Sequence, residues 1–150
     1  MNRRSALRAA GLSGSIALLI VFTASAIGQT AVVLAGPWAP HQRGYGHARP
    51  ATVDNNGDPT GRVSAIKWST WGGAKAIGMG VSDYVGAGQS VAQGSEEPAR
   101  IVAFHLGRCH GRRAYTAIEW YFQAHGQRFS AGTYIDPCTG TYYQDGKPLP

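Results

Sequence analysis

The sequence has 150 residues, of which 43% are hydrophobic and 15% charged, and it contains 21 glycines and two cysteines. This length suits one ordinary domain and excludes a large multidomain enzyme. The charged fraction lies below the roughly 25% that is usual for soluble domains. The aromatic and β-branched content excludes a chain that is disordered throughout.

The first 26 residues have the pattern of an export signal. Residues 16–22 form an apolar run, and residues 24–26 form a small-x-small tripeptide of the kind that signal peptidase cleaves. The positive start that precedes the run contains three arginines: Arg3, Arg4 and Arg8. The sequence therefore predicts a signal peptide over residues 1–26 and a secreted, extracellular protein.

Two alternatives remain for this segment. A second acceptable cleavage tripeptide lies at residues 33–35, so the cut can fall as late as residue 35. Residues 11–35 are also long enough to cross a bilayer of about 30 Å, which would leave the protein anchored in the membrane. Several polar residues interrupt this stretch, and for that reason cleavage is favoured.

The net charge depends on whether the signal is removed. The full chain has a formal charge of +6, and loss of the three arginines leaves 11 basic and 8 acidic residues, or +3. This value does not indicate nucleic-acid binding. A small basic group contains Arg108, Arg112 and Arg113. It is either a solvated turn or a surface that faces an anionic wall polymer or lipid.

Residues 27–61 and 62–150 differ in pattern. The first stretch contains Gly-Pro, Ala-Pro, Arg-Pro and Asn-Asn-Gly-Asp-Pro sequences, which prevent long regular elements and predict a flexible linker. From residue 62 onward, hydrophobic residues alternate with a period of two, which is the spacing of strands. No window there has helical periodicity.

The alternation predicts five strands and a short C-terminal hairpin around Tyr142 and Tyr143. We expect an all-β domain, a small antiparallel sandwich or partly open barrel of five to six strands. The five strands are predicted at residues 62–71, 74–85, 100–106, 113–123 and 128–136, with a polar loop over residues 86–98.

The two cysteines, Cys109 and Cys138, follow two of these strands. An even pair without a CxxC spacing in an exported protein predicts one structural disulfide. The alternative is a metal site in which His105 and His110 join the two thiolates. The neighbouring positions of Cys109 and His110 do not match a familiar zinc module, so no metal ligand is expected.

A further pattern involves tryptophan, alanine and glycine. Trp68, Trp71, Ala76, Gly78 and Gly80 form a W-x-x-W-x-x-x-x-A-x-G-x-G sequence. With the later Gly-Arg-Cys and Ala-Tyr-Thr-Ala-Ile segments, it resembles a family of small secreted actinobacterial proteins of unassigned function. The resemblance spans about residues 63–120. It implies a secreted protein with structural cysteines, and it implies no catalytic residue.

No catalytic or nucleotide-binding motif is present, and no cofactor is expected. The sequence lacks GxSxG, HExxH, a P-loop and a dinucleotide fingerprint. We therefore expect a non-enzymatic binding module whose unidentified partner is a component of the cell wall or envelope. An exposed aromatic group would be its recognition surface. The candidate ligand-binding residues are Trp68, Trp71, Tyr115, Tyr121, His105 and Glu119. On the simpler interpretation, the tryptophans and tyrosines are core residues and cross-strand pairs.

The alternative is a small secreted hydrolase that acts on glycans. It would use Glu119 together with Asp136, because glycoside cleavage needs two carboxylates in one cleft, or with His105, which could act as a base. On the simpler interpretation, Glu119 is an outward residue paired with Lys67 or an arginine, and His105 is a hydrogen-bonded structural residue.

Overall fold

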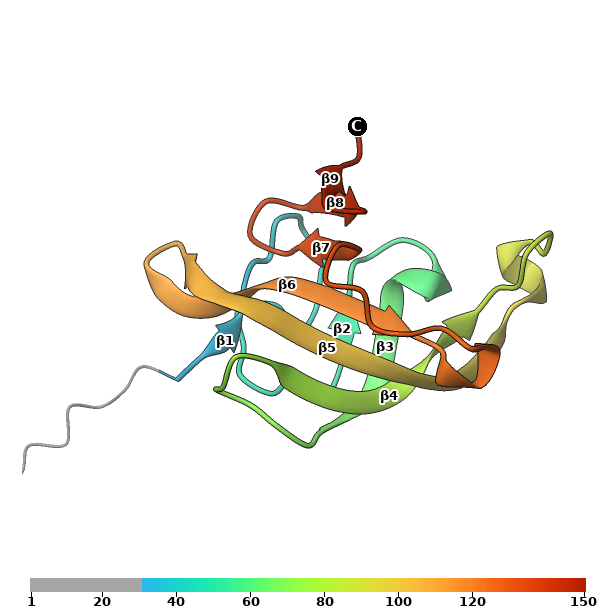
Figure 1. Ribbon diagram of the computed structural model, residues 1–150, viewed down its shortest axis with the longest axis horizontal. Helices are drawn as coiled ribbons and strands as arrows, with labels where there is room; N and C mark the ends of the chain where they lie inside the picture. The colour runs from blue at the N-terminus through green and yellow to red at the C-terminus, as the bar shows by residue number, and fades with distance from the viewer. Residues whose placement is uncertain (1–30) are drawn as a thin grey trace, which may run out of the picture.

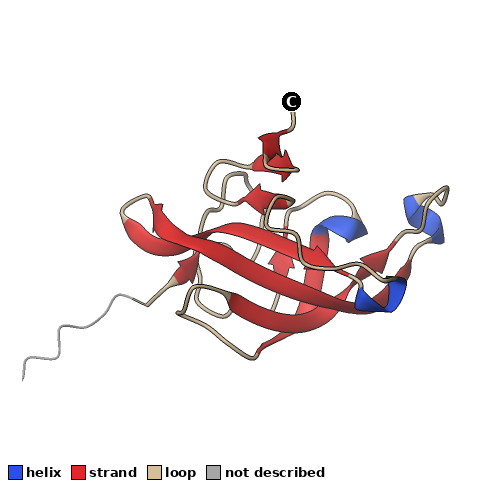
Figure 2. Ribbon diagram, viewed as in Figure 1, coloured by secondary structure: helices blue, strands red, loops and turns tan. Residues whose placement is uncertain are grey.

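The computed structural model describes residues 31–150, so the predicted signal peptide over residues 1–26 lies outside the described part. The described chain is all-β, as predicted (Figure 2). Its helical segments are single 3-10 turns at Pro59–Gly61 (η1), Val91–Gln93 (η2) and Gln123–His125 (η3). Within residues 31–150, no helix is both long and apolar enough to span a bilayer.

Nine strands form one curled sheet, which is an open half-barrel rather than a two-layer sandwich (Figure 1). The strands are β1 (Val33–Leu34), β2 (Val53–Asp54), β3 (Arg62–Trp68), β4 (Ala76–Tyr84), β5 (Ser95–Cys109), β6 (Arg112–Tyr121), β7 (Tyr134–Asp136), β8 (Thr141–Gln144) and β9 (Lys147–Pro148). Strands β2 to β9 follow one another across the sheet as antiparallel neighbours, and β1 pairs with β6 in parallel. The expected count of five to six strands was too low, because the shortest strands carry little periodicity.

The segment expected to be a flexible linker is instead packed structure from residue 31 to residue 61. Leu34 and Val53 are fully buried, and Tyr45 is 4% exposed. The backbone N–H of Ala35 donates to the carbonyl of Tyr115 at 3.0 Å, beside the pairing of β1 with β6. The Pro and Gly residues do prevent long strands here. They form turns between very short strands, so the segment closes the core instead of leading up to it.

Two other boundaries also differ from the expectation. Strand β5 begins at Ser95, which places Glu96 and Glu97 in the strand and not in a loop. The predicted strand over residues 128–136 is reduced to Tyr134–Asp136. The preceding residues form a loop whose backbone contacts the side chain of Glu119 instead of a neighbouring strand.

Two residues with positive φ interrupt the predicted alternation of faces. Ala65 has φ 51° at a bulge in β3, so Val63 and Ile66 are both buried although they are three positions apart. His105 has φ 52° in β5. Phe104 and Leu106, on either side of it, pack into different hydrophobic clusters. A strict period of two therefore fails at these positions.

The disulfide between Cys109 and Cys138 is present, as predicted, with a Cα–Cα distance of 5.8 Å. It joins the end of β5 to the turn after β7 and packs against Val33, Ala35 and Ala114. His110 Nδ1 lies 3.7 Å from the sulfur of Cys109. Because the two sulfurs are bonded to each other, neither is a thiolate ligand in this structure. A disulfide is consistent with an extracellular location.

Candidate binding cleft and neighbouring polar groups

Two of the predicted ligand-binding residues, Trp68 and Trp71, pack against the main core. Their rings meet edge to face with centroids 4.7 Å apart. The indole N–H of Trp68 donates to the carbonyl of Pro50 at 2.8 Å, and that of Trp71 donates to the carbonyl of Val32 at 2.8 Å. Both tryptophans therefore fasten the 31–61 segment to the sheet.

Tyr115 belongs to the same buried group and is 0% exposed. Its hydroxyl accepts a hydrogen bond from the N–H of Gly72 at 2.8 Å and donates one to the carbonyl of Gly73 at 2.8 Å. These bonds hold the turn between β3 and β4. The polar atoms of Trp68, Trp71 and Tyr115 are thus already hydrogen-bonded to main-chain groups. These three residues therefore stabilise the fold in this structure.

Glu119 and Tyr121 lie on the other face of the sheet. Glu119 pairs with Val102 in the ladder, beside the cluster of Val102, Phe104, Ala117 and Tyr121 with Phe129 and Tyr134. Its two carboxylate oxygens accept hydrogen bonds from the N–H of Ser130 at 3.2 and 3.0 Å. Burial raises the pKa of Glu119 to about 7, although the Ser130 bond acts in the opposite direction. The partner expected for Glu119, a basic side chain, is replaced by a backbone amide.

The two proposed partners of Glu119 are placed differently. Because Ile118 pairs with Ile135, Asp136 is on the same face of the ladder as Glu119, at a diagonal position. Such positions are about 7–8 Å apart. Asp136 also accepts a hydrogen bond from the N–H of Cys138 at 2.7 Å. His105 is exposed, and its ring lies 5.2 Å from that of Tyr134.

An apolar cleft of about 220 Å³ lies between β6 and the C-terminal strands β7 to β9. Two of the large hydrophobic side chains that line it are exposed to solvent: Tyr142 is 47% exposed and Leu149 is 48% exposed. The alternation of the strands places Ile118 and Trp120 on the same face as Tyr142. Further lining residues include Thr133, Ile135 and Gln144.

The sequence did not identify this cleft as a site. Tyr142 was expected in a C-terminal hairpin, and Trp120 on the hydrophobic side of the best-defined strand. One feature of the sequence could have indicated the cleft. The tyrosines at 142 and 143 are followed by an Asp-Gly turn and by Pro-Leu-Pro at 148–150, which places apolar residues at an edge of the sheet. Sequence spacing alone does not show that β7 to β9 stand beside Trp120.

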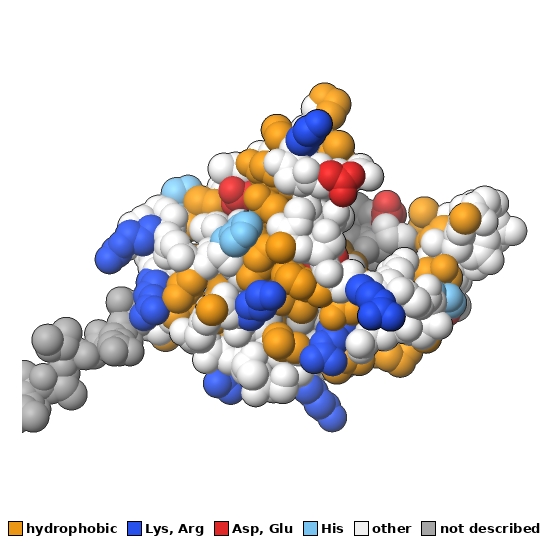
Figure 3. All heavy atoms as spheres, in the orientation of Figure 1, with side chains coloured by type: hydrophobic (Ala, Val, Ile, Leu, Met, Phe, Trp, Pro, Cys, Tyr) orange, Lys and Arg blue, Asp and Glu red, His pale blue; other side chains and the backbone are white. Residues whose placement is uncertain are grey.

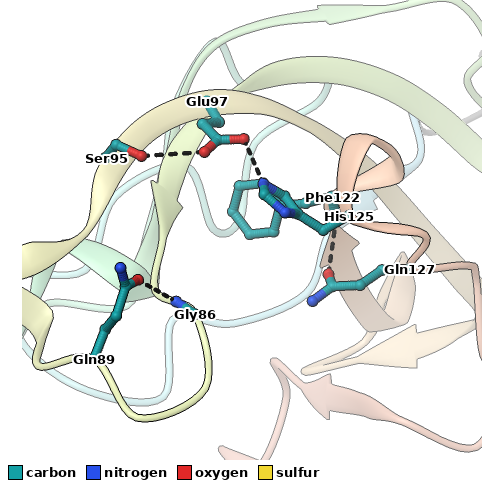
Figure 4. Close-up of polar contacts among 7 residues, drawn as sticks. All are labelled: Gly86, Gln89, Ser95, Glu97, Phe122, His125 and Gln127. Atoms are coloured by element: carbon teal, nitrogen blue, oxygen red, sulfur yellow. Dashed lines mark hydrogen bonds and ion pairs between the residues drawn. The ribbon is translucent and has the colours of Figure 1, made fainter.

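A polar cluster joins β5 to η3, just after the C-terminal end of β6 (Figure 4). His125 Nε2 lies 2.7 Å from a carboxylate oxygen of Glu97, and the hydroxyl of Ser95 donates to the other oxygen at 3.1 Å. The ring of His125 stacks on Tyr84 with centroids 3.5 Å apart. Glu97 lies between Ser95 and His125. In a hydrolytic triad the histidine must lie between serine and acid, so this cluster is a clamp between segments.

No family model matches the chain, and no curated protein or solved structure is significantly similar to it.

Proposed function

We propose that the protein is an exported binding module that recognises a glycan of the cell wall or envelope through the cleft between β6 and the C-terminal strands. The observation that carries this proposal is the exposure of Tyr142 and Leu149 in a cleft that also contains Trp120. Exposed aromatic side chains in a concave site are typical of ligand recognition.

The size and lining of the cleft indicate what it holds. Its volume of about 220 Å³ is smaller than the usual pocket for a drug-sized ligand. One sugar ring would fill it. The apolar face of such a ring would stack on Trp120 or Tyr142, and the hydroxyl groups would reach Thr133 and Gln144. The family resemblance of residues 63–120 and the disulfide both support an extracellular place for this binding.

Binding of purified wall glycans to variants of the cleft tests the proposal. Trp120→Ala and Tyr142→Ala should each weaken binding by about tenfold or more, because removal of a stacking ring costs about 1–3 kcal/mol. Met79→Ala and Val91→Ala are matched controls, since these side chains are exposed outside the cleft. The proposal is wrong if no wall glycan binds, or if the control variants lose as much affinity as the cleft variants.

A second candidate function, glycan hydrolysis, is favoured by one observation. A carboxyl group whose pKa is raised to about 7 suits a general acid near neutral pH, and Glu119 has this property. Asp136 would be the second carboxylate, and His105 its alternative. Incubation of wall glycans with the protein should then release reducing ends, and Glu119→Gln should abolish that release while glycan binding at the cleft persists.

A further inference from the structure

The hairpin that joins β5 to β6 presents arginines from both of its strands. Cys109 and Arg112 form the closing pair, and the two-residue turn between them has φ 47° at His110 and φ 78° at Gly111. Positive φ at both central positions is required by a two-residue type I′ turn. The twist of this turn matches that of the flanking strands. The turn therefore fixes the strands of the hairpin in one register up to its tip.

That register places Arg108 directly opposite Arg113. Side chains in this relation have Cβ atoms about 5 Å apart, and like charges there destabilise the sheet. Both arginines are exposed, and so is His110 in the turn. The one ion pair among residues 31–150 is formed by His125 and Glu97, so no carboxylate neutralises these two guanidinium groups within the described chain.

The hairpin is also held firmly to the body of the protein. The disulfide connects Cys109 to Cys138 in the turn after β7. On the other face of the hairpin, Arg112 Nη1 donates to the carbonyl of Gly46 at 3.1 Å. The hairpin projects from one end of the sheet (Figure 1), and the view in Figure 3 has Lys and Arg side chains at that end as well as elsewhere on the same face. The disulfide and the Arg112 hydrogen bond thus hold the two like charges of Arg108 and Arg113 next to each other on the surface.

We propose that Arg108 and Arg113 form a clamp for phosphate groups of a linear, phosphate-bearing polyanion. Two neighbouring guanidinium groups offer several donors to one phosphate, and the anion would remove the repulsion between them. Arg112 adds positive charge from the other face of the hairpin. This site is separate from the cleft between β6 and the C-terminal strands, and it does not depend on glycan binding there.

A polymer fits this tip better than a membrane surface does. The large hydrophobic residues that are exposed among residues 31–150 are Met79, Val91, Tyr142 and Leu149, and none of them belongs to the hairpin. Charge alone would therefore have to hold the tip on a lipid surface, without an apolar side chain that enters the bilayer. A polymer can be bound by direct hydrogen bonds from guanidinium to phosphate, and it needs no apolar side chain that enters a bilayer.

Inorganic polyphosphate is the probe, and its affinity is measured for the full secreted protein and for variants. Arg108→Gln with Arg113→Gln should weaken binding by roughly 25-fold, since each charge near a polyanion is worth about a factor of five. Arg62→Gln with Arg128→Gln removes the same charge from exposed positions elsewhere and should weaken binding less than threefold. The logarithm of the wild-type affinity should fall with the logarithm of salt concentration with a slope of about −1 to −2.

Thermal unfolding of the two double variants excludes a folding defect. The loss of like charges should leave the midpoint of Arg108→Gln with Arg113→Gln equal to the wild type or higher. Equal losses of affinity in both double variants would mean that net charge alone attracts the polymer, which overturns the clamp. Binding to phosphatidylglycerol vesicles without binding to polyphosphate would also overturn it, in favour of a lipid surface.

Discussion

The indole N–H of Trp71 donates to the main-chain carbonyl of Val32, 39 positions earlier in the chain, at a distance of 2.8 Å. Val32 is buried, and it precedes the short strand β1 that pairs with β6. Trp71 also packs edge to face on the ring of Tyr115, which is in β6. One side chain in the turn after β3 therefore connects the start of the described chain to the centre of the sheet.

Trp71→Phe should destabilise the protein, because it keeps an aromatic ring but leaves the carbonyl of Val32 without its donor. An unsatisfied buried carbonyl costs about 1–3 kcal/mol. Unfolding in urea should show a lower midpoint with an unchanged slope. Tyr142→Phe is the control: the side chain of Tyr142 is about half exposed, and the stability of this variant should stay within about 0.5 kcal/mol of wild type.

The two predicted cleavage sites should give chains of very different stability. A chain that begins at residue 27 retains the buried residues Val32, Val33, Leu34 and Ala35, whereas one that begins at residue 36 loses all of them. The loss of even one buried leucine typically costs about 2–5 kcal/mol. We expect the longer chain to unfold cooperatively and the shorter one to melt at a much lower temperature or to remain unfolded. Equal melting temperatures would show that β1 is dispensable.

The sequence predicts the fold class and the disulfide well, because both depend on signals that survive in one chain. The strand predicted over residues 113–123 nearly coincides with β6, and an even pair of cysteines without a CxxC spacing predicts a disulfide. The segment from residue 31 to residue 61 was misjudged for a physical reason. Its strands β1 and β2 have two residues each, which is too short for any period, and their burial comes from long-range contacts with Trp68, Trp71 and Tyr115.

The candidate sites were predicted less well than the fold. Trp68 and Trp71 were candidate binding residues on one interpretation and core residues on the other, and nothing in their spacing shows that the carbonyl groups of Pro50 and Val32 pair with their indoles. The position of Glu119 on the strand was correct, whereas its amide partner comes from a loop that was expected to be a strand. Exposure at Tyr142 depends on three short C-terminal strands that the sequence only suggests.

Removal of the disulfide should cost about 3–4 kcal/mol in the chain-entropy account of a loop of this length. The two cysteines are separated by 29 positions and join β5 to the turn after β7. Cys109→Ala with Cys138→Ala should therefore lower the free energy of unfolding by about this amount. Urea unfolding measures it, and thiol titration of the denatured, oxidised wild type should find no reactive sulfhydryl. Two free thiols in the wild type would contradict the structure.

The contact between Glu97 and His125 should stabilise the folded protein by an amount that decreases at acid pH. The hydrogen bond from His125 holds the pKa of Glu97 below its usual value. This stabilisation is present above the ordinary pKa of a glutamate, and it is lost as the pH falls through the lower value of the folded protein. His125→Gln should flatten that part of the stability profile. Hydrogen exchange in β5 near Ser95 should also be faster in the variant, because the clamp to η3 is weakened.

Glu119 should have the opposite pH dependence. Burial raises its pKa to about 7 in the folded protein, so the folded state binds a proton that the unfolded state has already lost between about pH 4.5 and pH 7. The contribution of Glu119 to stability therefore decreases as the pH rises through this interval. Glu119→Gln cannot ionise, and it should gain stability relative to the wild type between pH 4 and pH 8.

The difference between the two urea midpoints, measured at each pH, isolates Glu119 from the other carboxyl groups, which are common to both proteins. Asp145→Asn is a control that removes an exposed carboxyl group instead of a half-buried one. A constant difference for Glu119→Gln would mean that the carboxyl group of Glu119 has the same pKa in the folded and in the unfolded protein. Burial would then not be the dominant influence on it, and its suitability as a general acid would be lost.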